Sequence, residues 1–206
     1  MAAEHRVEVL RQGPPADALA KEIAAQLAPT GLKVIRGSKR TLCEIWLCTQ
    51  WTARDNFQPT AEVLYPFQPG QLIGVVRFRR KGGDFRDQDI RKGIYTLRYA
   101  QQPVDGNHEG TSPTRDFLVL VQAEQDTSNG PLAEEPLMKL SAAAAESDHP
   151  AMFCLQTVSG KTEPPPSIHH NEDHDWWIIR LQGKAKAGAK VHNLVIDLVI
   201  AGHAEE

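Results

Sequence analysis

A chain of 206 residues with 41% hydrophobic and 24% charged residues has the composition of an ordinary globular protein. Its 23 basic and 26 acidic side chains give a net charge of −3, so the overall field favours neither nucleic acid nor an anionic membrane as a partner. The longest apolar run near the end, 194–202, is interrupted by Asp197 and is far shorter than the roughly 20 residues of a spanning helix. We therefore expect one domain over 1–206, without a transmembrane segment.

The first 80 residues indicate strands and turns, with one helix. Val7 and Val9 alternate with charged residues, which predicts a short strand over 5–10. A helix is expected over about 15–28, because apolar residues recur there at every fourth position behind a proline pair. Further strands are expected over the ranges 32–36, 41–51, 61–65 and 72–79.

Two strands joined by a long polar loop form the centre of the chain. In 93–100, Tyr95, Leu97 and Tyr99 fall at every second position, which is the pattern of a strand with one buried face. In 117–121 both faces are apolar, so this strand should be more central in the sheet. The connecting loop, 101–114, holds the best cluster of polar side chains in the first half of the chain.

The second half predicts one alanine-rich helix over 134–147 and strands over 152–158, 176–181 and 191–201. The helices do not alternate with strands, and parallel sheets need regular helical crossovers. The expected fold is therefore mainly β, an antiparallel two-sheet sandwich of about nine strands with two peripheral helices. The residues nominated for its core are Ile45, Leu47, Val76, Phe78, Tyr95, Leu97, Leu118, Leu120, Ile178, Leu194, Ile196 and Leu198.

The three cysteines cannot all pair within one chain, which argues against a disulfide-built scaffold. Cys43 and Cys48 lie in one expected strand, with Cα atoms roughly 16 Å apart at about 3.3 Å per residue, so a bond between them is excluded. Cys43 and Cys154 can pair if their strands are neighbours. All three lie in apolar strands, where thiols are usually buried and inert.

The run Lys92-Gly93-Ile94-Tyr95-Thr96-Leu97 resembles the Gly-x-Tyr-x-Leu strand entry of an uncharacterised family of bacterial extracytoplasmic β-sandwich proteins. The loop that begins at Gln102 and the closing strand fit the same family, so the resemblance covers about 32–206. It implies a β-sandwich and export, and it implies no activity. The N-terminus lacks the apolar core of a signal peptide, which leaves a cytoplasmic protein or the mature form of an exported one.

The densest set of possible metal ligands lies in 167–175. His169, His170, Glu172 and His174 offer the nitrogen and oxygen donors that zinc or another divalent ion takes, and His108 in the central loop would complete the site if the two loops meet. Their spacing matches no standard zinc motif, and the prolines just upstream favour a loop. A polar, solvated loop without metal is the alternative.

Signatures of nucleophilic catalysis and of phosphate binding are absent from the sequence. There is no Gly-x-Ser-x-Gly, and Lys81 with its two following glycines lacks the rest of a phosphate loop. We therefore predict a non-enzymatic binding or interaction module for an unidentified protein or small-molecule ligand, located in the periplasm or secreted. The alternative function is a metal-dependent enzyme that uses the His- and carboxylate-rich loop, and the alternative location is the cytoplasm.

Overall fold

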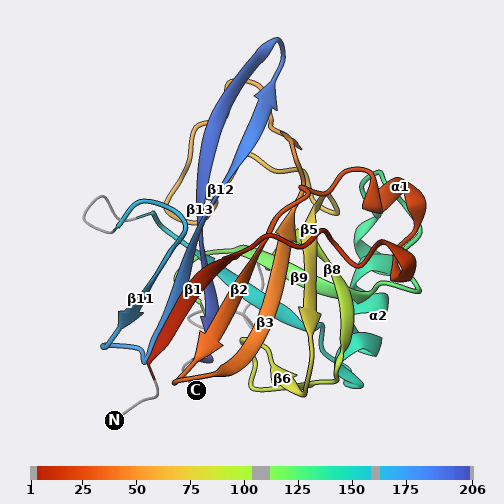
Figure 1. Ribbon diagram of the computed structural model, residues 1–206. Helices are drawn as coiled ribbons and strands as arrows, with labels where there is room; N and C mark the ends of the chain where they lie inside the picture. The colour runs from red at the N-terminus through yellow and green to blue at the C-terminus, as the bar shows by residue number, and fades with distance from the viewer. Residues whose placement is uncertain (1–3, 104–111, 159–162, 205–206) are drawn as a thin grey trace.

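The computed structural model describes residues 4–103, 112–158 and 163–204 (Figure 1). Its main element is an antiparallel sheet in which neighbouring strands follow the order β1-β2-β3-β5-β8-β9-β10-β13-β12-β11. The short β4 (Trp51–Thr52) joins β12 in parallel, and β6 (Gly82–Gly83) pairs with β7 (Asp89–Ile90). The long strands, in sheet order, are β1 (His5–Leu10), β2 (Gly31–Arg36), β3 (Arg40–Leu47), β5 (Leu72–Phe78), β8 (Gly93–Gln101), β9 (Asp116–Gln122), β10 (Met152–Gln156), β13 (Lys190–Ala201), β12 (Trp176–Ala187) and β11 (Ser167–Asn171).

The prediction of a mainly β, antiparallel fold is confirmed, but the strands form a nearly closed, barrel-like sheet and not clearly a two-sheet sandwich. One continuous ladder runs from β1 to β11. The two end strands contact each other, yet no ladder joins them among the described residues. The sequence pattern predicts antiparallel strands joined by turns. Whether such strands form two packed sheets or one barrel depends on the curvature of the sheet, which the pattern does not give.

The helix expected over 134–147 is present as α2 (Glu134–Ala145), which packs Leu137 against the outer face of β9. The helix expected over 15–28 is wrong as a continuous element. That segment holds only the 3-10 turn η1 (Ala16–Ala18) and the single-turn α1 (Lys21–Ala24). Leu19 between them is extended, with φ −121° and ψ 151°.

The apolar spacing of this N-terminal segment nevertheless marks its buried side. Leu19, Ile23 and Leu27 are all buried in the main core. The backbone of Leu27 bridges to Cys48, and Ala28 N donates to Leu47 O at 2.8 Å. Pairing with the end of β3 therefore replaces helical hydrogen bonds, and tertiary contacts override local helix propensity.

Three strand predictions need correction. The segment 61–65 forms no strand. The His-rich segment, expected to be a loop, forms β11, because it pairs along β12 from Ser167 opposite Arg180 to Asn171 opposite Trp176. β12 also continues to Ala187 instead of ending near Leu181, so that β12 and β13 form a long hairpin that rises beyond the rest of the sheet (Figure 1).

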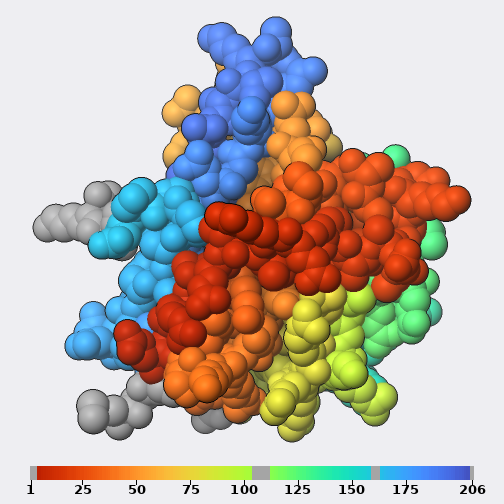
Figure 2. Space-filling model, viewed as in Figure 1, coloured from red at the N-terminus to blue at the C-terminus, as the bar shows by residue number. Residues whose placement is uncertain are grey.

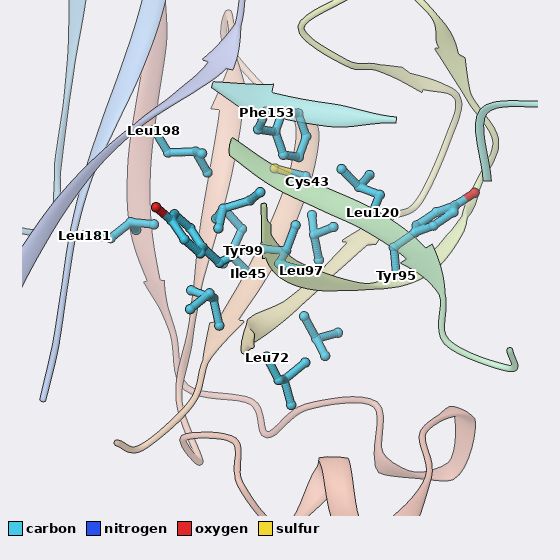
Figure 3. Close-up of a cluster of buried hydrophobic side chains, with 14 of the residues drawn as sticks. Cys43, Ile45, Leu72, Tyr95, Leu97, Tyr99, Leu120, Phe153, Leu181 and Leu198 are labelled. Carbon is cyan, nitrogen blue, oxygen red and sulfur yellow. The ribbon is translucent and has the colours of Figure 1, made fainter. Parts of the chain in front are cut away.

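Side chains from the inner face of the sheet form the core (Figure 3). Tyr99 and Leu97 of β8 point toward Ile45 of β3 and Leu198 of β13 in this view. The nominated core residues are buried, except that Leu47 and Leu194 are only partly buried. All three cysteines are free thiols in the structure, and β3 and β10, which carry Cys43 and Cys154, are not neighbours.

Candidate binding groove

His170 of β11 and His174 of the following turn each stack on a tryptophan. His170 Nε2 lies 2.7 Å from Asp175 Oδ1, and its ring stacks on Trp177 with centroids 4.5 Å apart. His174 stacks on Trp176, with centroids 4.4 Å apart. Successive strand residues point to opposite faces of a sheet, so the two histidine rings lie on opposite sides of β12.

His169 is half-buried next to an ion pair on β12 and β13. Arg180 donates to Asp197 from Nε at 2.9 Å and from Nη2 at 2.7 Å. Burial lowers the pKa of His169, and the Asp197 charge opposes this shift. Nδ1 of His169 is buried without a hydrogen-bond partner in the described part of the chain. The neutral ring is therefore favoured at this position.

The structure does not gather the predicted metal ligands among the residues it describes. Glu172 is exposed in the turn after β11. Over 4–103, 112–158 and 163–204, no three His, Cys, Asp or Glu side chains are placed to hold a metal ion. His108 lies outside the described residues, so a metal site that includes it stays a prediction.

A gap in the hydrogen-bonded ladder exposes one edge of β12. β11 covers this edge up to Arg180, and β4 covers it again from Ala185 onward. Between them, 181–184 has no strand neighbour on this side in the described part of the chain. Prolines 164–166 stand immediately before β11, and proline has no N–H to donate to a ladder, so the strand cannot continue along β12.

The opposite wall of this gap is β1, whose sole ladder among the described strands is with β2. Figure 2 shows the N-terminal strand in red on the same face as the blue β12–β13 hairpin and the light-blue segment next to β11. A cavity of about 550 Å³ lies between these walls. We call it the seam groove, and its lining includes Val9, Leu32, Leu47, Pro166, Gly183 and Lys184.

The seam groove combines an apolar floor with a polar rim. Val9 pairs with Leu32 of β2, whose side chain faces the core, so Val9 lies on the inner side of the sheet. It is nevertheless 58% exposed. Lys184 is the single charged residue among the described residues of the lining. Cys48 lies at the buried end, where burial raises its thiol pKa to about 12. The thiol is therefore protonated at neutral pH and is no nucleophile.

The walls of the groove are fixed by tryptophans that pack on glycines. A Cβ atom on Gly31 would lie 2.6 Å from Trp46 Nε1, and one on Gly183 would lie 2.5 Å from the Trp51 ring. Each indole is also anchored through its N–H, which donates to Gln12 O from Trp46 and to Ile73 O from Trp51, both at 2.9 Å. The groove is thus held open by packed residues and not by loops alone.

Asp116, a carboxyl group with a raised pKa, is closed off from solvent. Burial raises its pKa, and it accepts hydrogen bonds from Tyr99 Oη and from the backbone N–H of Leu64. Its exposed fraction is 0%. A substrate cannot contact this carboxyl group, so its role is to join β8, β9 and the 60s segment.

The sequence did not point to the residues of the seam groove. The sequence predicts only short strands at Val9 and Leu32, and Gly183 and Lys184 lie between the strands expected over 176–181 and 191–201. One signal was present, because a proline run directly before a strand marks the point where pairing must stop. The sequence predicts a loop, not a strand, after these prolines, so the end of strand pairing could not be predicted from them.

Comparisons with known proteins leave the chain without an assigned family. No family model matches it, and neither the curated proteins nor the solved structures provide a match. Among the described residues, no helix is both long enough and apolar enough to cross a membrane.

Proposed function

We propose that this chain is a non-enzymatic binding module that acts outside the cytoplasm and holds its ligand in the seam groove. The observation that carries the proposal is the cavity of about 550 Å³ between two strand edges. Ligand sites usually measure about 300–1,000 Å³ and are common in the mouths of β-barrels. The extracytoplasmic location rests on the family resemblance alone.

The chemistry of the groove supports binding and not catalysis. Its described lining offers one ammonium group, Lys184, and the protonated thiol of Cys48. General acid–base catalysis needs a titrating group near the operating pH, and burial raises the pKa of the Cys48 thiol well above that range. The fixed walls reduce the entropy that binding would otherwise lose in ordering the site.

The metal-dependent alternative has less support. Two of its histidines stack on different tryptophans, on opposite sides of β12. The role of His108 is open, since it lies outside the described residues.

Binding of an uncharged apolar dye, N-phenyl-1-naphthylamine, tests the proposed site through the rise in dye fluorescence. Saturable binding is expected, and Val9→Trp should weaken it by about tenfold or more, because the larger side chain fills the groove. Val191→Trp is the matched control, since Val191 is 51% exposed on β13 and outside the groove lining. A protein that binds no dye, or that binds it equally well with Trp at position 9, contradicts the proposal.

A further inference from the structure

The edge of β12 presents to the seam groove backbone groups that have no partner among the described residues. Ala187 and Lys190 flank a two-residue turn, and hydrogen bonding in the β12–β13 ladder alternates from that pair. Ala53 N donates to Lys186 O at 2.8 Å, so the Lys186 carbonyl points away from β13. The N–H and C=O groups of Gln182 and the N–H of Lys184 follow the same alternation and face the groove.

The edge of β1 presents the complementary wall. Gly37 N donates to Glu4 O at 2.7 Å, which places the backbone groups of residue 4 on the β2 side. The β1–β2 register runs without a shift from His5 to Leu10, so the even-numbered residues bond to β2. The N–H and C=O of Val9 therefore face the groove, which Gln182 also lines.

The direction of the strands fits one further strand between these walls. Every pair of neighbouring strands in the order from β1 to β11 is antiparallel. β1 and β12 therefore run in the same direction, and β11 runs in the opposite direction. A segment lying in the groove along the line of β11 would be antiparallel to both walls. It would take the place that prolines 164–166 deny to the chain itself.

We propose that the ligand of the seam groove is an extended peptide that adds a strand between β12 and β1. This inference rests on the proposed function and names the ligand class of the same groove. Unpaired edges on both sides are a template for strand addition, in which the main chain supplies affinity and alternate side chains supply specificity.

The lining also defines the side chains that such a peptide carries. Alternate residues of an added strand face inward, toward Val9, Leu32 and Leu47, and should be apolar. The residues between them face outward, beside the exposed side chains of Gln182 and Lys184. An acidic residue at an outward position would complement the Lys184 charge. The expected ligand is therefore a peptide that alternates apolar with polar or acidic residues.

Capped seven-residue peptides with Val, Leu or Phe at alternate positions, and Thr and Glu between them, test this inference by fluorescence anisotropy. We expect saturable binding of at least one peptide below about 1 mM, and a loss of about tenfold or more when alternate backbone nitrogens are methylated. Methylation keeps the side chains and removes the donors of one edge. Equal affinity for the methylated and unmethylated peptides would show that the groove binds side chains without main-chain hydrogen bonds, and this would overturn the inference.

A protein variant supplies the second arm of the test. Gln182→Pro removes an N–H that bonds to no described strand, and edge positions tolerate proline. Peptide affinity should fall by about tenfold or more, whereas Gln182→Val, which keeps the N–H, should stay within about threefold. Both variants should retain the wild-type circular dichroism spectrum. Equal peptide affinity in the two variants overturns the inference.

The two proposals fail in different ways. If the dye binds and Val9→Trp blocks it, but no peptide binds below about 1 mM, strand addition is overturned and the groove remains a ligand site. If neither dye nor peptide binds, both proposals fail.

Discussion

The line where β1 meets the far end of the sheet has a closed half and an open half. In the closed half, the Trp177 ring lies between those of His5 and His170, with centroid distances of 4.6 and 4.5 Å. In the open half, Val9 and Lys184 line a groove that no described strand fills. The same two strands, β1 and β12, border both halves.

The difference lies in the segment between these strands. Residues 167–171 have backbone N–H groups and pair with β12, whereas the preceding prolines have none. The end of a proline run therefore sets where the sheet closes and where it stays open. A polar strand with low β propensity can close a barrel when its neighbours supply the ladder and aromatic rings cover its side chains.

Loss of the Trp177 ring should have the largest effect on the closed half. We expect Trp177→Ala to lower the free energy of unfolding by about 2–3 kcal/mol, because the contacts of its ring with His5 and His170 are lost. The loss is somewhat smaller than for a fully buried tryptophan, since the Trp177 ring is partly exposed. Urea unfolding followed by circular dichroism measures this. Val9→Ala in the open half should cost less than about 0.5 kcal/mol. Equal losses would show that the two halves do not differ in packing.

Replacing the proline run should close the open half. In a variant with Pro164→Thr, Pro165→Val and Pro166→Thr, we expect β11 to extend along β12 and to lower dye affinity by about tenfold. Hydrogen exchange at the Gln182 amide should slow in the same variant, because that N–H gains a partner. Pro164→Thr alone is the control, since it keeps the two prolines that line the groove. Unchanged exchange at Gln182 would show that the prolines do not set the gap.

A smaller effect, the dependence of stability on pH, should arise from His169 in the closed half. The folded-state pKa of His169 is lowered, so the unfolded chain takes up a proton first, near about pH 6.5. The stability contributed by the neutral ring is present above that value and is lost as pH falls through it. The melting temperature should therefore drop between about pH 7.5 and 5.5, and His169→Gln should reduce this drop.

The exposed His149 provides the comparison for this measurement, and His149→Gln should leave the drop unchanged. Asp197 favours the charged His169 ring, while Arg180 adds to the effect of burial. A drop of equal size in wild type and His169→Gln would assign the pH dependence to other groups.

Local patterns predicted the strands that carry one apolar face. The alternation of Tyr95, Leu97 and Tyr99 correctly marked β8, and its side chains are buried as expected. The same kind of pattern failed over 15–28, where spacing at every fourth residue correctly indicated burial of Leu19 and Ile23 but not backbone conformation. The periodicity of apolar residues therefore indicates which side chains are buried. The hydrogen-bond partners of the backbone depend on residues that are distant in the sequence.

The candidate site depends on contacts that sequence patterns do not encode. β11 is polar, and it becomes a strand because Ser167–Asn171 pairs with β12. The open edge of Gln182 follows from the register of β12 with β13, which starts at the turn after Ala187. The contact between β1 and β11 brings together the two ends of the strand order. Curvature of the whole sheet brings them together, so no local window could have predicted it.

The free cysteines have a consequence for redox chemistry. Burial raises the thiol pKa of Cys48 to about 12 and that of Cys154 to about 11, and it also raises that of Cys43. At neutral pH these thiols are therefore protonated. Oxidants and disulfide exchange act on thiolates, so all three sulfurs react slowly while the sheet is intact. Burial in the folded sheet therefore protects these three thiols when the surroundings change from reducing to oxidising.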